Sequence, residues 1–212
     1  MAMDRARMWD ERYSGDEYQF GTRPARFLTA HAGELPTGGS ALAVADGEGR
    51  NSVFLAESGL AVTAMDISPV GVDKARSLAR ARGVTVDLRV ADILQWGWEP
   101  DAYDVVAAVF IQFLAPDQRA VVFEGMQRTL RPGGLLLLHG YRPEQIGFGT
   151  GGPPIPENLY TEAMLRSAFG GLRIEHLASY TAELEEGSGH VGPSALIDLI
   201  ARKPAADRPA AS

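Results

Sequence analysis

The chain has 212 residues, of which 45% are hydrophobic and 22% charged, enough for one α/β domain with a full core. A net charge of −7 argues against nucleic acid as the main partner, and the lack of cysteine excludes disulfides, thiolate metal ligands and a cysteine nucleophile. No apolar run approaches the roughly 20 residues that span a bilayer, and residues 1–11 hold no signal-peptide core. We therefore expect a cytoplasmic protein without membrane contact.

The N-terminal segment, residues 1–35, is rich in aromatic side chains. Ala6–Tyr13 is predicted to be helical, and a second short helix is predicted over Pro24–Ala32, because proline is tolerated in a first helical turn. Aromatic faces attract a nearby cation. The segment is therefore predicted to cover a ligand site as a lid, with simple packing onto the domain as the alternative; its aromatic residues are Trp9, Tyr13, Tyr18, Phe20 and Phe27.

From residue 41 short apolar runs alternate with helical segments. The predicted strands are Ala41–Ala45, Leu60–Met65, Val84–Val90, Tyr103–Phe110 and Leu135–His139. The predicted helices are Asn51–Glu57, a segment capped by Ser68 and ended by Gly83, and Asp117–Leu130, the last with Val121, Val122, Met126 and Leu130 facing inward. This alternation is typical of βαβ units, in which a parallel sheet is covered by helices on both faces.

The pattern changes after residue 140. A glycine- and proline-rich loop, Gly147–Pro156, precedes a predicted helix over Thr161–Phe169. Two long β-like runs, Leu172–Leu184 and His190–Arg202, then predict an antiparallel hairpin at the sheet edge. We expect a single domain over residues 1–204 and a disordered tail over residues 205–212.

Polar residues follow the predicted strands at the point where each strand ends. In open parallel sheets, ligands bind outside the carboxyl ends of the strands. A glycine turn, Asp46–Asn51, follows the first strand, and Asp66 follows the second at a distance suited to accepting hydrogen bonds from ribose hydroxyls. Asp92 lies at the end of the third strand, where its carboxylate can accept a hydrogen bond from the exocyclic amine of adenine. Together these features predict a cofactor that contains adenosine.

The glycine turn discriminates between such cofactors. A dinucleotide site usually shows three glycines, G-x-G-x-x-G, whereas this turn has only Gly47 and Gly49 and adds the acids Asp46 and Glu48. Negative charge is unfavourable beside a pyrophosphate but acceptable beside the ammonium and sulfonium of S-adenosylmethionine (SAM). The turn therefore favours SAM over NAD or FAD.

Several segments carry a resemblance to a known family; they are Trp9–Tyr13, Gly47–Asn51, Val62–Ser68, Val90–Asp92, Leu130–Gly134 and Gly149–Pro154. Over residues 5–204 the chain is similar to class I SAM-dependent methyltransferases, and it resembles most the bacterial tellurite-resistance and thiopurine methyltransferase-like branch. The resemblance implies a Rossmann-like, mostly parallel seven-stranded sheet with a C-terminal antiparallel hairpin and SAM over the first two strands. The implied cofactor contacts are Tyr18, Asp46, Gly47, Gly49, Asn51, Asp66, Ile67, Asp92, Ile93 and Phe110.

The chain departs from the usual first motif of that family. The motif has an acid within the strand and a glycine at its end, and here those positions hold Ala43 and Ala45. The amino group of SAM must then find other partners, for which backbone carbonyls and Asp46 are the candidates.

The acceptor side is less well defined. His190, which opens the last strand after a glycine turn, is the preferred catalytic candidate, and Tyr13 and Gln112 are the others. The loop Gly147–Pro156 is long enough for a second lid, and the acidic run Glu183–Glu186 is interpreted as a solvated hairpin tip. The sequence shows no pair of histidines at the spacing typical of metal ligands, so no metal site is predicted.

The expected function is methyl transfer to a small-molecule acceptor by a monomer or homodimer. Two alternatives stay open: a SAM-binding protein without transfer activity, and a nucleotide-dependent oxidoreductase. A soft sulfur or selenium acceptor would need no general base, whereas a hydroxyl or amine acceptor would benefit from one.

Overall fold

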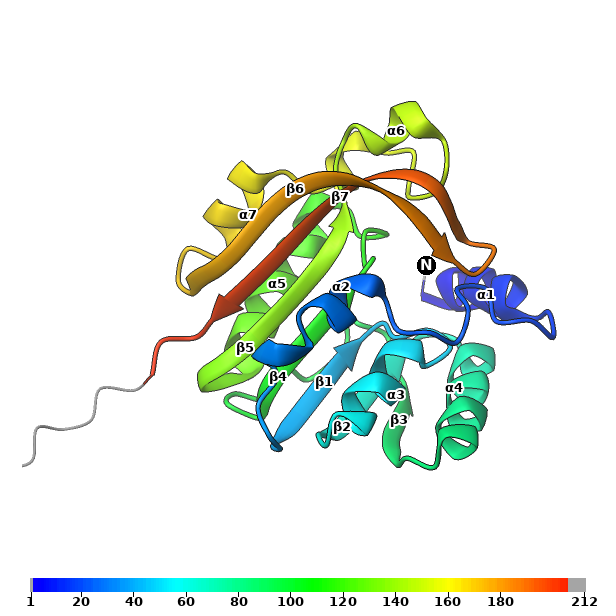
Figure 1. Ribbon diagram of the computed structural model, residues 1–212, viewed down its shortest axis with the longest axis horizontal. Helices are drawn as coiled ribbons and strands as arrows, with labels where there is room; N and C mark the ends of the chain where they lie inside the picture. The colour runs from blue at the N-terminus through cyan, green and yellow to red at the C-terminus, as the bar shows by residue number, and fades with distance from the viewer. Residues whose placement is uncertain (1, 206–212) are drawn as a thin grey trace, which may run out of the picture.

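The computed structural model describes residues 2–205, with one central sheet between layers of helices (Figure 1). Seven strands form the sheet in the order β3-β2-β1-β4-β5-β7-β6. β7 runs antiparallel to both of its neighbours, whereas the other pairings are parallel. The predicted sheet and its C-terminal hairpin are confirmed; the strands are β1 (Ser40–Val44), β2 (Ala61–Asp66), β3 (Val86–Val90), β4 (Tyr103–Val109), β5 (Leu130–Tyr141), β6 (Arg173–Glu186) and β7 (His190–Arg202).

The strand order places a topological switch point at β1. After β1 the chain builds β2 and β3 on one side, and then crosses to β4 on the other side. The connections leaving β1 and β4 therefore diverge, which opens a crevice at the carboxyl ends of these strands.

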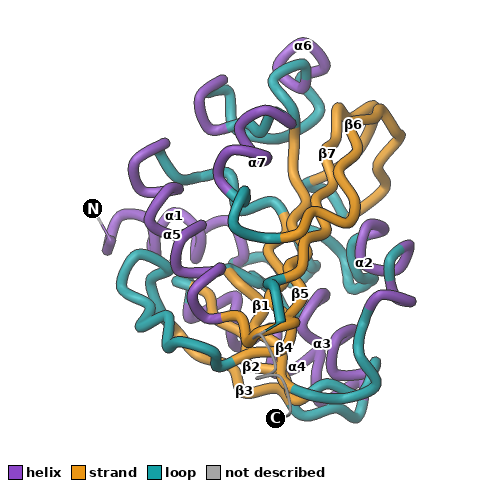
Figure 2. Tube along the Cα trace, turned by 90° about the vertical axis from the view of Figure 1, so that its left-hand side faces the viewer, coloured by secondary structure: helices purple, strands orange, loops and turns teal. Residues whose placement is uncertain are grey.

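Helices cover both faces of the sheet (Figure 2), with α2, α3 and α4 on one side and α5 and α7 on the other. Their bounds are α1 (Ala2–Tyr13), α2 (Arg26–Ala30), α3 (Arg50–Glu57), α4 (Pro69–Arg82), α5 (Pro116–Thr129), α6 (Gln145–Phe148) and α7 (Glu162–Ala168), with 3₁₀ turns at Ala32–Glu34 and Pro156–Asn158.

Two hydrophobic clusters hold the layers together. On the α5 and α7 face, Phe123, Leu165 and Phe169 are buried against the strands. On the opposite face, Phe27 and Leu28 of α2 and Leu55 of α3 are buried against other residues of the same strands. Because strands such as β4 and β5 bury both faces, they read as continuous apolar runs in the sequence.

Local signals explain where α4 begins and ends. The Ser68 hydroxyl accepts a hydrogen bond from the Gly71 amide at 3.0 Å, and Pro69 occupies the first helical position. Gly83 ends the helix in the left-handed conformation, with φ of 70°.

Several expectations need correction. Val121 is 58% exposed because α5 turns Val122, Phe123 and Met126 inward instead. β5 begins at Leu130 rather than at Leu135, because Leu130 already pairs with Tyr103 of β4 before a register shift that leads to the Leu135 pairing. Apart from Ala205, the tail predicted to be disordered lies outside the described residues.

The helices between residues 2 and 205 are all too short or too polar to cross a membrane.

Candidate active site

A cavity of about 410 Å³ opens at the switch point. Strand ends form its floor, α1 and the loop at Gly151–Pro154 form its sides, and the start of β7 closes it. In Figure 1 the tip of the β6–β7 hairpin reaches across to α1. The cavity brings together most of the residues predicted from the sequence: Tyr13, Asp46, Gly47, Asn51, Asp66, Ile67, Asp92, Ile93, Phe110, Gln112 and His190.

Two predicted cofactor contacts lie outside the cavity lining. The Tyr18 hydroxyl donates to the Lys74 carbonyl at 3.1 Å, so this side chain lies along α4. Gly49 precedes α3 at φ of 93°, and a Cβ there would come within 2.7 Å of the Ala75 backbone. Gly49 therefore permits close packing of the turn on α4. The requirement for glycine at this position has a structural cause.

Asp46 presents a free carboxylate oxygen to the cavity. Its Oδ1 accepts the Ser52 amide at 3.1 Å, whereas Oδ2 is buried and has no hydrogen-bond partner among the described residues. Burial raises the pKa of Asp46 to about 7, and the Ser52 hydrogen bonds oppose this rise. A buried, unpaired acceptor fits a cationic donor, as the SAM ammonium would be.

Asp66 holds the glycine turn in place. Its two carboxylate oxygens accept the Gly47 amide at 2.8 Å and the Ser68 amide at 2.9 Å. Burial raises the pKa of this carboxyl to about 6, against the lowering effect of those amides. Each carboxylate oxygen can accept a second hydrogen bond, so Asp66 can still bind two ligand hydroxyls.

Asp92 is paired with the N-terminal helix. Arg5 of α1 donates to Asp92 Oδ2 at 2.8 Å, and the Leu94 amide donates to Oδ1 at 3.0 Å. The carboxylate is therefore shared between its own turn, α1 and any ligand, unlike Asp66, whose partners are backbone amides only.

The first turn shows why the missing motif glycine is tolerated. Ala45 adopts φ of 48° and Phe110, after β4, adopts φ of 57°, both in the left-handed region that glycine favours. Such strained residues concentrate at functional sites. Ala45 thus adopts a backbone conformation that glycine would adopt with less strain.

Replacing Ala45 with glycine should stabilise the protein by about 0.5–1 kcal/mol, because the relief of left-handed strain exceeds the added chain entropy. The matched control is Ala43→Gly, which should cost about 1 kcal/mol or more within a buried strand. Urea denaturation followed by circular dichroism checks both values. A destabilised Ala45→Gly variant would contradict the strain assigned to this turn.

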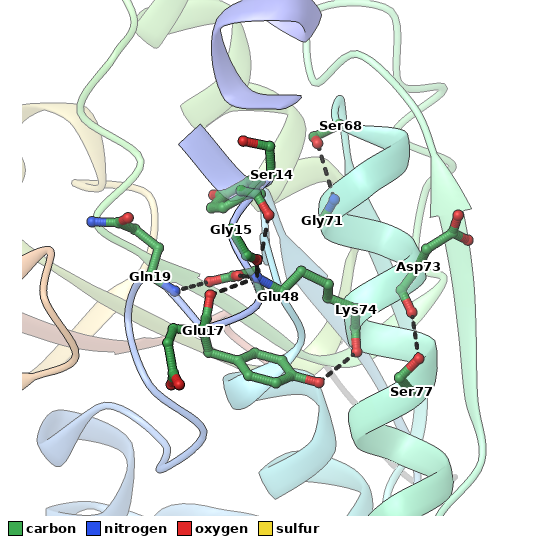
Figure 3. Close-up of polar contacts among 12 residues, drawn as sticks. Ser14, Gly15, Glu17, Gln19, Glu48, Ser68, Gly71, Asp73, Lys74 and Ser77 are labelled. Carbon is green, nitrogen blue, oxygen red and sulfur yellow. Dashed lines mark hydrogen bonds and ion pairs between the residues drawn. The ribbon is translucent and has the colours of Figure 1, made fainter. Parts of the chain in front are cut away.

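Lys74 of α4 fixes the segment that follows α1 (Figure 3). Its ammonium donates to the carbonyls of Gly15 at 2.9 Å and Glu17 at 2.7 Å, and forms an ion pair with Glu48 at 2.6 Å. Glu48 in turn accepts the Gln19 amide at 2.7 Å. Glu48 and its partly buried ion pair with Lys74 therefore anchor the segment after α1 to the glycine turn.

Two further contacts hold the N-terminal segment in place. Asp10 of α1 accepts the Ser68 hydroxyl at 2.5 Å at the start of α4. At the other end, the Gly189 amide donates to the Gln19 carbonyl at 2.9 Å, and a Cβ on Gly187 would come within 2.5 Å of the same carbonyl. The hairpin tip therefore packs closely against the N-terminal segment and is hydrogen-bonded to it.

His190 faces a carboxylate that the sequence analysis interpreted as solvated. Glu186 is 10% exposed at its side chain, lies 2.8 Å from the Arg50 guanidinium and accepts the Arg26 amide at 3.0 Å. Its Oε2 lies 3.7 Å from His190 Nδ1. Within the acidic run, the interpretation is therefore wrong for Glu186, because the hairpin turn folds it inward onto α3.

The pKa shifts of this pair agree with its surroundings. Burial lowers the pKa of His190 below its ordinary value, so the ring is neutral at pH 7. Burial would raise the pKa of Glu186, but hydrogen bonding to His190 and the Arg50 charge outweigh it and lower the pKa to about 2. Sequence spacing offered a signal for this pair, since Glu186 and His190 flank one glycine turn.

Gln112 and Tyr13 line the cavity in different ways. The Gln112 side-chain amide bonds both the carbonyl and the amide of Tyr141, at 2.7 and 2.6 Å, so its polar atoms are already engaged. The Tyr13 ring is stacked on Trp9 with ring centroids 5.4 Å apart. Burial, followed by the neighbouring Asp66 and Glu48 charges, raises the Tyr13 pKa well above its ordinary value, so its hydroxyl stays protonated.

Comparisons with known proteins agree with this geometry. Residues 41–134 match the family model described as a methyltransferase domain. The chain is 33% identical over 125 residues to a carboxy-S-adenosyl-L-methionine synthase of Pseudomonas entomophila, covering 56% of this chain and 49% of that protein. The chain spans 39–49% of the length of the curated relatives it matches.

Solved structures show the same fold. One is a protein from a study of the conversion of a disulfide bond into a thioacetal group during echinomycin biosynthesis, with a TM-score of 0.77 at 22% identity, covering 96% of this chain and 92% of that chain. TehB from Haemophilus influenzae gives a TM-score of 0.67 at 18% identity, covering 84% and 61%. The solved structures share the Rossmann-like sheet of this chain, and residues 41–134 within it match the methyltransferase domain model.

Proposed function

We propose that this protein transfers the methyl group of SAM to a small-molecule acceptor inside the cavity. The observation that carries the proposal is the placement of polar groups in the cavity, with the carboxylates of Asp46, Asp66 and Asp92 at the strand ends and His190 at the hairpin. The carboxylates suit a ligand with an ammonium, a ribose and an adenine amine. The concave shape of the site and the net charge of −7 support a small acceptor over nucleic acid.

In this proposal the residues of the chain bind, orient and exclude water. Asp66 and Asp92 would hold the adenosine portion, and Asp46 Oδ2 would hold the ammonium. SAM supplies an electrophilic methyl group when bound, and transfer needs the acceptor atom aligned with that methyl in a site free of water. The contacts of Gln19 with Glu48 of the glycine turn and with Gly189 of the hairpin tip support the N-terminal segment, residues 1–35, as the cover that excludes water.

His190 is proposed as the general base for a hydroxyl or amine acceptor. With Nδ1 of His190 oriented toward Glu186, the other ring nitrogen, Nε2, would be left to accept the proton of the acceptor's hydroxyl or amine. Arg50 neutralises the Glu186 charge. Glu186 is therefore proposed as a positioning residue. Tyr13 and Gln112 remain proposed acceptor-side contacts, and the single-domain organisation of residues 1–204 and the tellurite-resistance-like branch also remain proposals.

The direct test is calorimetry with SAM, S-adenosylhomocysteine (SAH) and NAD. We expect both sulfur ligands to bind in the micromolar range and NAD to show no binding. Incubation with SAM and a panel of small thiols, phenols and amines should then release SAH. Tight binding without turnover on any acceptor class would favour a SAM-binding protein without transfer activity, and preferential NAD binding would favour an oxidoreductase.

The affinity for SAH should depend on pH through Asp46. Because the Asp46 pKa lies at about 7 before binding, the carboxylate loses its charge below that pH, whereas the ammonium of SAH keeps its charge. Affinity should therefore fall as pH decreases from 7.5 to 6, by up to about tenfold per unit below the pKa. Asp46→Asn should bind weakly and without this slope. Parallel pH profiles for the wild type and Asp46→Asn would show that Asp46 does not bind the ammonium group.

A further inference from the structure

A cluster of histidines lies outside the lining of the cavity described above. His31, at the end of α2, and His176, on β6, lie with Asp198 of β7 so that one ligand atom from each falls within 4.8 Å of the others. His139 of β5 contacts the same aspartate. Three of the four histidines of the chain thus surround one carboxylate.

The sheet register explains this convergence. Asp198 pairs with His139 on one side and with Ala178 on the other. Because side chains two residues apart share a sheet face, His176 and Tyr180 flank the small Ala178 on the face that carries Asp198. A register shift between Ile174 and His176 marks a bulge in β6 next to this histidine, and bulges commonly re-aim a side chain.

The two oxygens of Asp198 have different surroundings. Oδ1 contacts His139 Nδ1 at 2.5 Å and accepts the Tyr180 hydroxyl at 3.2 Å. Oδ2 faces His31 Nε2 at 4.0 Å, a distance too long for a hydrogen bond. One oxygen is therefore held by oriented partners, while the other faces two imidazoles.

We propose that His31, His176 and Asp198 Oδ2 bind a divalent transition-metal ion such as Zn²⁺. Two imidazoles and one carboxylate suit zinc, cobalt or nickel, whereas calcium and magnesium prefer all-oxygen sites. With bonds of about 2.0–2.1 Å, tetrahedral ligands lie about 3.4 Å apart, so the three atoms need a small contraction. His139 and Tyr180 supply the outer contacts that orient a metal-bound carboxylate.

The carboxylate at this cluster is buried, whereas the two imidazoles are partly exposed. Asp198 supplies the negative charge that attracts a cation.

The site would join three separate elements rather than take part in methyl transfer. The His139 ring is stacked on Phe27 at 5.1 Å and lies 4.6 Å from Phe110, which lines the cavity. The ion would instead tie α2 to the edge hairpin. Metal binding should thus raise the melting temperature and leave the SAH affinity unchanged.

The test uses the full chain, without an affinity tag and stripped of metal by EDTA and dialysis. Titration with Co²⁺ should give the visible absorption of a tetrahedral complex, saturating at about one ion per chain and displaced by Zn²⁺. His31→Gln and His176→Gln should each weaken Co²⁺ binding by about 100-fold or more, because even outer contacts are worth about 10–100-fold. Both side chains are partly exposed, which favours folding of the variants.

The matched control is His190→Gln, which removes the histidine outside the cluster and should leave Co²⁺ binding intact. Circular dichroism and SAH calorimetry report whether each variant is folded. Absence of a saturable Co²⁺ complex in folded wild-type protein, or retention of full affinity in both cluster variants, would overturn the proposal. Either outcome leaves the SAM site unaffected.

Discussion

Asp66→Ala is expected to weaken SAH binding by about 100-fold or more, because two charge-assisted hydrogen bonds to ribose hydroxyls, at about 1.5–3 kcal/mol each, would be lost. The carboxylate is buried and held by the Gly47 and Ser68 amides, so its geometry is set before the ligand arrives. Preorganised acceptors of this kind lose little entropy on binding. Isothermal calorimetry on wild type and variant gives the comparison.

Asp92→Ala is the matched comparison, with an expected loss of about tenfold, because a single hydrogen bond to adenine would be lost. Its carboxylate also bonds Arg5, so α1 should become more mobile in this variant. A larger loss for Asp92→Ala than for Asp66→Ala would reverse the assignment of the two ends of the nucleoside.

A ligand variant separates direct contact from damage to the turn. Asp66→Ala also removes the acceptors for Gly47 and Ser68, which alone could distort the site. A 2′-deoxy analogue of SAH should bind more weakly than SAH to wild type and equally well to Asp66→Ala. An additive loss in this cycle would show that Asp66 acts only through the turn.

His190→Asn should lower the turnover of a hydroxyl or amine acceptor by about 10²–10⁴-fold, the usual value of a general base. The ring lies between Phe110 and Phe20, at 4.2 and 4.4 Å, and lines the cavity opposite the carboxylates. SAH affinity should stay within about twofold, because the base would contact the acceptor. Release of SAH under saturating SAM measures the effect; an unchanged rate on such an acceptor would show that His190 is not its general base.

Glu186→Gln distinguishes a positioning role from simple packing. Its carboxylate raises the pKa of His190 against the lowering effect of burial, so its removal should move the acidic limb of the pH–rate profile to lower pH. Turnover should fall by about tenfold as orientation of the ring is lost. Glu186→Asp should recover part of both effects, whereas a structural role alone would leave the acidic limb in place. Melting temperature controls for the unpaired Arg50 charge.

Local patterns predicted much of the fold. Strands such as β4 and β5 bury both faces and read as apolar runs, and Ser68 and Gly83 lie at the ends of α4 as their chemistry requires. Strand-end residues could be placed together because every parallel strand of one sheet ends at the same edge. Asp46, Asp66 and Asp92 therefore line one cavity without any long-range information in the sequence.

Contacts between distant segments could not be predicted in this way. Glu186 has the composition of a solvated hairpin tip, and only its position beside Arg50 and His190 buries it. Tyr18 has the polar tip expected of a pocket residue, yet its hydroxyl donates a hydrogen bond to the Lys74 carbonyl. Both outcomes depend on how the hairpin and the N-terminal segment meet over the sheet.

The amino-acid sequence alone was enough to predict the parallel sheet, its C-terminal hairpin and the carboxylates at the strand ends. Hydrophobic periodicity, helix caps and turns each depend on only a few neighbouring residues, so they can be recognised without the tertiary structure. The tertiary structure decided which histidines share a site. His190 joins Glu186 at the cavity, while His31 and His176 meet at Asp198 across three elements. Burial and charge pairing depend on neighbours far along the chain, and folding alone brings those neighbours together.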